Sequence, residues 1–412
     1  MAFNVKWNCK NAPLRVLSFL VAVVVVEVFI GLTATDYFKA VLVRGVQYSN
    51  KVKLKSRYQL SSTLVNQTQT RFGAWVWTTD DLVKDFNEML AQDTDAPNDY
   101  FPYPCGNKAY ACTQSCPQSL SPDPTQRLVD ILVSPNLTLS QPQLDAILSM
   151  TKSIPESDIV ILSATSSNHY DEMQAMFENL HSVVYPVTKY FSVVLFDIGL
   201  TPEQRRMTEE KCACHVITFP FELFPDHVKD AHCFSWKPLI VRATIEKARH
   251  LLVYQDASIR WTDYFQVFLR RIDRIGLQLT RSSTNNRIPV NTLPQMFAYM
   301  GEAPCAFSQF PELHASNAGY RRDALIIRAI LEPWARCALE ASCMCPVESS
   351  LVIDCVKLVA EHRCHRFDQS ALGIIGAKLF GDEFYRVMLP DMDAYLDINR
   401  DQVMPDYFRS IR

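Results

Sequence analysis

"SWKPLIVRATIEKARHLLVYQDASIRW", residues 235–261, contains the two patterns from which the fold can be predicted. Its first half has apolar residues at Trp236 and at the third, fourth and seventh positions after it, the spacing of an amphipathic helix. Its second half begins with Leu251–Tyr254, a short and mostly apolar run typical of a strand covered on both faces. Asp256 and Ser258 follow that run, so two polar residues stand where a buried strand is expected to end.

The residues before this stretch repeat the alternation of strand and helix patterns. Residues 169–185 and 201–211 have helical character, and the second segment begins with Thr201 as N-cap and Pro202 at the first helical position. Such alternation predicts parallel strands joined by right-handed crossovers, and therefore an α/β fold with a mostly parallel sheet sandwiched by helices. The further strands are expected at residues 158–165, 191–199 and 214–220.

Three more helices are expected outside this alternating core. Residues 140–154 begin with a capping Ser140, residues 262–276 are amphipathic, and residues 317–346 read as largely helical up to a cysteine cluster. Because the first of these leads directly into the alternating region, we expect one globular domain over residues 141–412.

The N-terminal region predicts a membrane anchor. Residues Val16–Ala34 form an apolar run with one charge, Glu27, and a run of about 20 residues spans a bilayer as a helix. We expect a retained signal-anchor at 14–34, and a cleaved signal peptide is the alternative. Glu27 would either pair across a helix dimer, giving a homodimer, or lie near the membrane interface.

Residues beyond this run carry features of the secretory lumen. The basic residues flanking the run favour a cytoplasmic N-terminus at 1–13. Asn66 and Asn136 lie in glycosylation sequons, and an even number of cysteines, which suits disulfides, follows the run. We therefore expect a single-pass type II protein of the Golgi or ER membrane with a luminal domain.

Residues 35–140 are expected to form a luminal stem. They are poorly patterned, and their later part is rich in Pro, Asn, Asp and Ser, a composition typical of loops. Cys105, Cys112 and Cys116 are expected to staple this loop by disulfides, with a metal knuckle as the alternative. We also expect disulfides for the cysteines of "CAC" (212–214) and "CMC" (343–345), which resemble metal spacings only loosely.

Composition excludes several functional classes. A formal net charge of −3 gives no basic surplus, which argues against a nucleic-acid partner. Only 11 glycines are present, and the sequence contains no GxGxxG, P-loop, HExxH or GxSxG motif. The sequence therefore lacks the motifs typical of dinucleotide oxidoreduction, P-loop phosphoryl transfer, zincin proteolysis and α/β-hydrolase chemistry.

Asp256 and Ser258 are the first candidate site. In open α/β sheets, ligands bind beyond the carboxyl ends of the strands. Two oxygen-bearing side chains there could hold Mn²⁺ or Mg²⁺ and a diphosphate, and the metal would neutralise a departing nucleoside diphosphate. The alternative is an Asx-turn that ends a strand.

Two neighbouring segments could complete that site. Thr165 ends the predicted strand at 158–165 and Ser166 follows it, and both are expected to line the nucleotide. Lys237, near the start of the helix that precedes the Asp256 strand, could reach a phosphate, and a solvated lysine is the alternative.

"HRCHRFDQSALGI" (362–374) is the second candidate site. Asp368 and Gln369 are expected to face the sugar or the acceptor hydroxyl, with Asp368 as base or donor-orienting residue and Arg366 offsetting phosphate charge. In the alternative reading Asp368 caps the helix that follows. A metal site at His362 and His365 is a further alternative.

The quoted segments, together with "EPWARCALEASCMCP" (332–346), resemble a nematode-expanded family of glycosyltransferase-like type II membrane proteins. The resemblance covers roughly residues 158–381 and implies a GT-A-like fold. In that fold an Asp-x-Asp motif at a strand end binds metal and nucleotide sugar; here the second acid is Ser258. "FDQSALG" is similar to the Asp-Gln segment of retaining GT-A enzymes, which adjoins the donor sugar.

The predicted function is therefore a luminal glycosyltransferase that moves a sugar from a nucleotide-diphosphate donor to a glycan, protein or lipid acceptor. Asp256 and Ser258 would hold the diphosphate with or without a cation, and Asp368 would face the reacting centre. The alternative is a catalytically inactive GT-A-like ectodomain that acts as a membrane-tethered binding or adaptor module.

Overall fold

The computed structural model describes residues 78–92, 116, 119–282, 286–347, 355 and 364–411. The chain divides into two compact units, Met1–Val76 and Trp77–Arg412, and every described residue belongs to the second. The predicted tail, signal-anchor and first sequon lie outside the described residues, as do Cys105, Cys112 and His362. None of the helices that the structure describes is both long and apolar enough to cross a bilayer.

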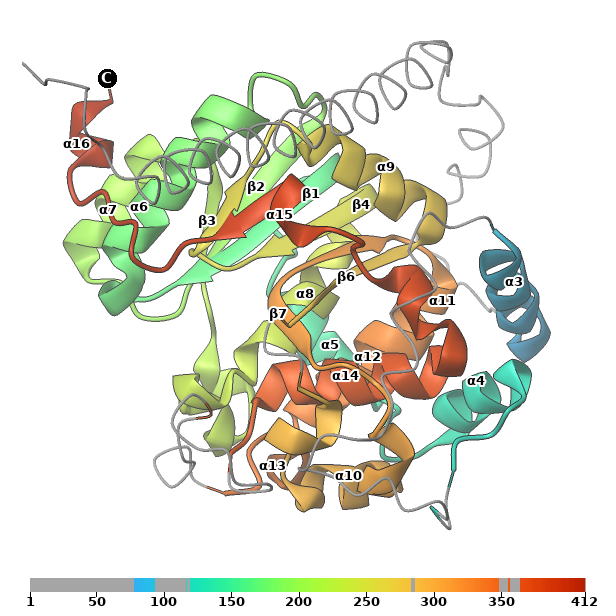
Figure 1. The fold of residues 1–412 in the computed structure, drawn as a ribbon. Helices are drawn as coiled ribbons and strands as arrows, with labels where there is room; N and C mark the ends of the chain where they lie inside the picture. The colour runs from blue at the N-terminus through green and yellow to red at the C-terminus, as the bar shows by residue number, and fades with distance from the viewer. Residues whose placement is uncertain are drawn as a thin grey trace, which may run out of the picture. The chain divides into compact units, whose positions relative to one another are not determined.

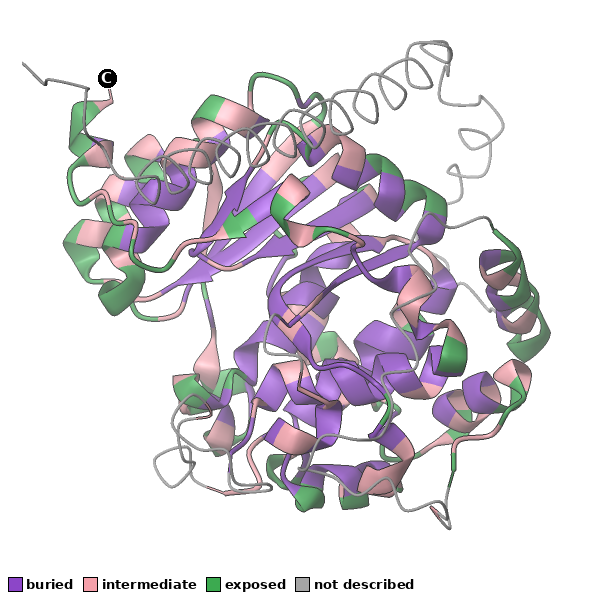
Figure 2. Cartoon of the chain, viewed as in Figure 1, coloured by how far each residue is buried: buried purple, intermediate pink, exposed green. Residues whose placement is uncertain are grey.

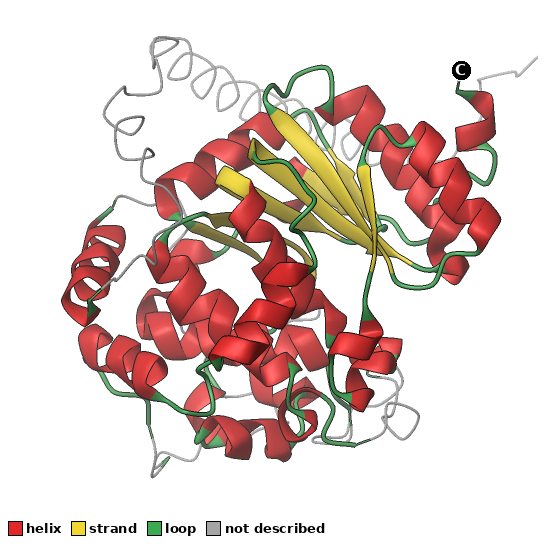
Figure 3. Cartoon of the chain, turned by 180° about the vertical axis from the view of Figure 1, so that it is seen from behind, coloured by secondary structure: helices red, strands yellow, loops and turns green. Residues whose placement is uncertain are grey.

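A six-stranded sheet with the order β3-β2-β1-β4-β7-β6 forms the centre of this unit (Figures 1 and 3). Strands β1 to β4 are parallel, as the alternation predicted, and β7 is antiparallel to both of its neighbours. The strands are β1 (Ser157–Thr165), β2 (Phe191–Asp197), β3 (His215–Thr218), β4 (Ala248–Gln255), β6 (Leu277–Arg281) and β7 (Leu313–Arg321), and a separate antiparallel pair consists of β5 (Ile259–Trp261) and β8 (Leu396–Ile398).

Side chains alternate between the two faces of the sheet along each strand. Both faces carry apolar side chains, and helices pack on both. Val160 and Leu162 of β1 pack on one face with α5, α8, α12 and α14, whereas Ile161 packs on the other with α6, α9 and α16. Figure 2 shows the sheet buried between these layers. The helices are α3 (Thr79–Ala91), α4 (Pro124–Val133), α5 (Gln141–Ser149), α6 (Tyr170–Asn179), α7 (Pro202–Lys211), α8 (Trp236–Thr244), α9 (Phe265–Ile275), α10 (Pro294–Met300), α11 (Ala324–Ile326), α12 (Glu332–Ala338), α13 (Ala341–Met344), α14 (Phe367–Phe380), α15 (Met392–Tyr395) and α16 (Tyr407–Ser410).

Strand β7 corrects the prediction for the second half of the chain. We expected helix from residue 317, but residues 317–321 belong to β7, which hydrogen-bonds β4 on one side and β6 on the other. Gly319 allows α9 to pack closely on this strand, because a Cβ atom there would lie 2.3 Å from Cδ1 of Ile272. The pairing of two neighbouring strands thus overrides a local pattern that favours helix.

The globular unit also begins earlier than predicted, so the boundary at residue 141 is wrong. Helix α3 buries Phe86, whose ring centroid lies 5.7 Å from that of Phe380 in α14. Arg127 of α4 donates hydrogen bonds to the carbonyls of Leu379 (3.2 Å) and Phe380 (3.0 Å). Residues 78–92 and 119–140 are therefore part of the domain core, not of a stem.

Cysteines of the described residues form disulfides, as expected for "CAC" and "CMC". Cys116 does not staple its own loop but pairs with Cys305, next to α10. Cross-links between distant segments restrict the unfolded chain and so stabilise the folded one. The pairs are Cys116–Cys305, Cys212–Cys214, Cys233–Cys345, Cys337–Cys343 and Cys355–Cys364.

Candidate functional site

The candidate site lies where the strand order reverses. From β1 the chain proceeds outward to β2 and β3 and then returns to the opposite side of β1 as β4. Thr165 ends β1 and Asp256 directly follows β4, so both lie at the carboxyl edge of this switch point, where α/β sheets bind ligands. Strand β7 begins at the same edge, and the Asp256 N–H donates to the Ser316 carbonyl at 2.6 Å.

Lys237 joins the two candidate segments of the sequence. Its Nζ lies 3.0 Å from Oδ2 of Asp368 and 3.3 Å from Oδ1 of Asp256, and it donates to the Ala315 carbonyl at 3.1 Å. Only 4% of its side chain is exposed, so the alternative of a solvated lysine is wrong. One buried ammonium therefore brings together the acids of β4 and α14.

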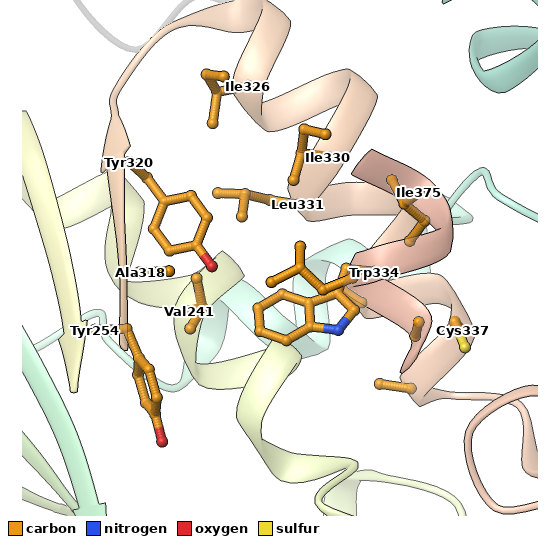
Figure 4. Packing of buried hydrophobic residues seen from close by; sticks show 14 of the residues in the cluster. Val241, Tyr254, Ala318, Tyr320, Ile326, Ile330, Leu331, Trp334, Cys337 and Ile375 are labelled. Carbon is orange, nitrogen blue, oxygen red and sulfur yellow. The ribbon is translucent and has the colours of Figure 1, made fainter. Parts of the chain in front are cut away.

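Asp256 is the open member of this cluster. Its Oδ1 accepts a hydrogen bond from the Tyr254 hydroxyl at 2.5 Å, in addition to the Lys237 contact. Its side chain is 30% exposed, against 6% for Asp368. Figure 4 shows Tyr254 beside Tyr320 of β7, with both hydroxyls directed away from their own strands. Asp256 is thus held from the protein side and faces solvent on the other.

Asp368 lies in the first turn of α14, whose N-cap residue is Arg366. It does not cap the helix as the alternative reading had it, because its carboxylate is directed to Lys237. Burial raises the pKa of Asp368, and the Lys237 ammonium opposes that rise only in part. A carboxyl group in this setting holds a proton more readily than an exposed one.

The charges of the cluster favour an ionised lysine. Burial alone would lower the pKa of Lys237, but the carboxylates of Asp256 and Asp368 raise it above its usual value. Burial and the neighbouring Asp256 carboxylate raise the pKa of Tyr254, so its hydroxyl stays protonated and donates. The ammonium is therefore a permanent positive charge between two acids.

Two aromatic residues in left-handed backbone conformations precede the charged residues. Phe234 has φ 52° and lies three residues before Lys237, and Phe367 has φ 40° and directly precedes Asp368. Their ring centroids are 6.1 Å apart, and Phe234 is 38% exposed beside the cluster. Residues other than glycine rarely adopt this conformation, and such strain is concentrated at functional sites.

The other predicted site residues are distributed around this cluster. Thr165 and Ser258 are buried, whereas Ser166 is half-buried and donates to Oδ1 of Asn168 at 2.5 Å. Arg366 and Gln369 do not contact Asp256 and instead converge on Glu312. Gln369 donates to Oε1 of Glu312 at 2.7 Å, and Nε of Arg366 lies 3.7 Å from the same atom.

The sequence interpretation missed three basic side chains, of which two histidines interact electrostatically with Asp256. The hydrogen bond to Glu172 raises the pKa of His169, which follows β1, and Asp256 adds to that rise. Burial, with Arg400 and Arg366, lowers the pKa of His314 in β7 to about 4. Arg400, just after β8, acts electrostatically on both imidazoles. His314 and Arg400 could not be found because neither β7 nor β8 was predicted.

His365 does not belong to a metal site. Its Nδ1 accepts a hydrogen bond from the Leu293 N–H at 3.2 Å, and Nε2 of the neutral imidazole donates one to the Met344 carbonyl at 3.3 Å. Burial lowers its pKa to about 4. Both ring nitrogens are therefore used within the core, and the metal alternative for His365 is wrong.

Comparisons with known proteins give a family and a set of solved structures. A family described as "Protein of unknown function (DUF1647)" matches residues 128–242, which include β1 to β3 and Lys237. No curated protein matches the chain.

The solved structures to which the chain is similar include several glycosyltransferases. For the mannosyltransferase Ktr4p from S. cerevisiae in complex with GDP, the identity is 10%, the match covers 72% of this chain and 81% of that one, and the TM-score is 0.34. For mouse xyloside xylosyltransferase 1 the identity is 11%, the match covers 57% of this chain and 84% of that one, and the TM-score is 0.31. For the galactosyltransferase LgtC the identity is 14%, the match covers 43% of this chain and 59% of that one, and the TM-score is 0.28, so the match spans little more than half of that enzyme.

Proposed function

We propose that the unit Trp77–Arg412 is a glycosyltransferase domain that transfers a sugar from a nucleoside diphosphate donor to a glycan, protein or lipid acceptor. The observation that carries this proposal is the position of the Lys237–Asp256–Asp368 cluster at the switch point of the sheet. A fixed cation holds two acids here, of which Asp368 is buried and Asp256 is open to solvent. This arrangement suits a site that binds and activates a charged ligand.

In this proposal, each segment at the carboxyl edge has a separate role. Thr165 and Ser166 at the end of β1 line the nucleotide, and Asp256 and Ser258 border the diphosphate. Lys237 fixes the positions of Asp256 and Asp368 and offsets their charge. Gln369, held by Glu312, orients the donor sugar from the first turn of α14.

The chemistry would be a displacement at the anomeric carbon. The bond from this carbon to the diphosphate oxygen breaks, and its electron pair leaves with the phosphate. The acceptor hydroxyl oxygen forms the new bond and its proton passes to a base. Asp368, whose pKa is raised by burial, is placed to orient the donor or to accept that proton. Carboxylates also favour the positive charge that develops on the sugar ring.

An inactive binding module on the same fold is the second candidate. Ser258 stands where a second acid would be needed for an Asp-x-Asp pair, and both acids of the cluster are already engaged by Lys237. Such a module would keep the sheet and its carboxyl edge but would bind a glycan or protein without transferring a sugar.

We propose for the whole chain a single-pass type II topology in the Golgi or ER membrane, anchored by residues 14–34. The anchor could also hold two chains together as a homodimer. Two features of the described residues support a luminal domain: its disulfides and the exposed position of Asn136 in its sequon. Removal of a glycan by peptide N-glycosidase from the wild type, with no change in the double variant Asn66→Gln/Asn136→Gln, tests this topology.

The variant Asp256→Asn tests the catalytic proposal. It keeps the shape of the side chain and removes its charge, so donor hydrolysis measured as free nucleoside diphosphate should fall below detection while circular dichroism is unchanged. The matched control is Asp145→Asn on the exposed surface of α5, which should keep full activity. Unchanged hydrolysis in Asp256→Asn would contradict the assignment of this site.

A thermal-shift screen separates the two candidate functions. An enzyme should be stabilised by nucleoside diphosphates or by nucleotide sugars, since any ligand that binds only the folded state raises the melting temperature. Stabilisation by glycans alone, with no response to any nucleotide, would favour the binding module.

A further inference from the structure

The ligands around Asp256 do not fit a dedicated divalent metal site, although GT-A-like folds often use one. Mn²⁺ and Mg²⁺ seek about six oxygen ligands, with carboxylates preferred. Oδ1 of Asp256 is already committed to the Tyr254 hydroxyl and the Lys237 ammonium. Asp368 is buried against the same ammonium. Of these two acids, only Asp256 is open to an ion, and one of its two carboxylate oxygens is already used.

Ser258 does not supply the missing ligand. It is only 4% exposed, and its carbonyl accepts a hydrogen bond from the Asn399 N–H at 2.8 Å, which ties it to the loop after β8. Its hydroxyl also brings no negative charge.

No group of ligands elsewhere at this edge makes up for Ser258. Within the described part of the chain, three acidic, histidine or cysteine side chains come close enough to share an ion only at Asp230, Cys233 and Cys345. Two of these are joined as a disulfide.

Lys237 already provides a positive charge between the two acids. Like charges repel strongly over a few ångströms in a buried site, so a divalent ion placed against Asp256 would oppose the ammonium 3.3 Å from that carboxylate. The ammonium is itself buried among Asp256, Asp368 and the Ala315 carbonyl, so it is not exposed to a diphosphate.

Arg400 is exposed, and its neighbour Asn399 hydrogen-bonds Ser258, two residues after Asp256. The electrostatic reach of Arg400 includes His169 and His314, which also interact with Asp256. Its guanidinium can bind phosphate oxygens through two parallel hydrogen bonds.

We propose that Arg400 binds the diphosphate of the donor, with Lys237 as an internal counter-cation, and that no divalent metal ion is needed. This inference rests on the proposed glycosyltransferase function and concerns how the same site neutralises its ligand. It assigns Arg400 as a binding residue and Lys237 as a positioning residue.

The test measures binding of UDP and GDP to the full chain in detergent by calorimetry, with EDTA and with Mn²⁺. At least one of them should bind with the same Kd, within about twofold, in both conditions. Arg400→Gln should weaken that binding about tenfold or more, as expected for the loss of a charge-assisted contact. Arg409→Gln, an exposed arginine of α16, is the matched control and should leave Kd unchanged.

The outcomes distinguish this inference from the proposed function. Binding that disappears in EDTA and returns with Mn²⁺ overturns metal independence and leaves the glycosyltransferase proposal standing. Metal-independent binding that Arg400→Gln does not weaken overturns the role of Arg400. Absence of binding by either nucleotide in both conditions removes the proposed function and this inference together. Arg400 is exposed, so its variant should fold even where a Lys237→Met variant does not.

Discussion

Helix α8 holds a buried cation near each end, and the two differ in their surroundings. Near its start, Lys237 contacts Asp256 and Asp368. Near its end, Arg242 contacts Glu246 at 2.8 Å and Glu332 at 3.2 Å. Both cations are 4% exposed, and each bridges two acids from different segments of the chain.

The acids of Arg242 have further cationic partners, whereas within the described residues Asp256 and Asp368 form ion pairs with Lys237 alone. Arg322 lies 3.0 Å from Glu246, and Arg328 lies 3.0 Å from Glu332. In the Lys237 cluster, two carboxylates share one ammonium, and Asp256 is open to solvent. In the Arg242 network each acid contacts two cations, so the network is closed and structural. The Lys237 cluster has one uncompensated negative charge at the edge where a ligand would bind.

The largest expected effect comes from breaking the closed network. Arg242→Met should lower the free energy of unfolding by about 3 kcal/mol, because removing one member of a buried ion network leaves the others under-paired. Chemical denaturation measures this loss. Arg249→Met, which removes a half-exposed pair with Asp158, should cost at most about 1 kcal/mol. Equal losses in the two variants would show that the Arg242 network is not special.

Removing the buried acid of the open cluster should affect activity more than stability. Asp368→Asn should reduce donor hydrolysis about a hundredfold, a typical loss for one positioned catalytic group. Because burial raises the pKa of Asp368, ionising this group opposes folding, so the melting temperature should stay level or rise. A clear fall in melting temperature with full activity would place Asp368 among structural residues instead.

A smaller effect is expected from the second partner of Asp256. Tyr254→Phe removes the hydroxyl that donates to Oδ1 of Asp256 and should lower stability by about 1 kcal/mol. It should also reduce activity severalfold, because Asp256 then has only Lys237 to hold it. Tyr299→Phe removes a hydroxyl that donates to the Asn136 carbonyl away from the site. It should change stability by a similar amount without changing activity, and a loss of activity there would contradict the comparison.

The two networks should also respond oppositely to pH, which is the smallest effect. Burial would raise the pKa of Glu246, but Arg242 and Arg322 outweigh burial and lower this pKa. The stabilisation that ionised Glu246 gives is therefore present above its unfolded pKa and is lost as the pH falls through its folded pKa. The pKa of Asp368 is raised, so stability should increase as pH falls from neutral through its folded value. Unfolding free energies of wild type, Glu246→Gln and Asp368→Asn over pH 3 to 7 measure both slopes. The same sign for both groups would contradict this assignment.

The parallel half of the sheet could be predicted because its strands are continuous apolar runs bounded by helices with clear caps. Strand β7 could not, since "LHASNAGYR" has small and polar residues whose extended conformation depends on β4 and β6. Helix α3 was missed although Leu82, Phe86 and Met89 have helical spacing, because the loop after it dominated the composition of the region.

The candidate site shows the same division between local and tertiary information. Asp256 and Asp368 were identified separately, one from a strand end and one from a polar cluster before an apolar run. Their connection through Lys237 could not be predicted, because it depends on how closely α14 approaches α8. Arg400 was missed because strand β8, which precedes it, is only three residues long.

Two of the disulfides lie close in sequence to charged residues of this cluster. Cys233 lies four residues before Lys237 and is tied to Cys345, and Cys364 lies four residues before Asp368 and is tied to Cys355. The chain therefore has a disulfide cross-link close to Lys237 and another close to Asp368, the two residues that form the ion pair. A copy that folded in a reducing compartment would retain its sheet but lose these cross-links, so ligand binding at this site would report whether the protein had matured in an oxidising one.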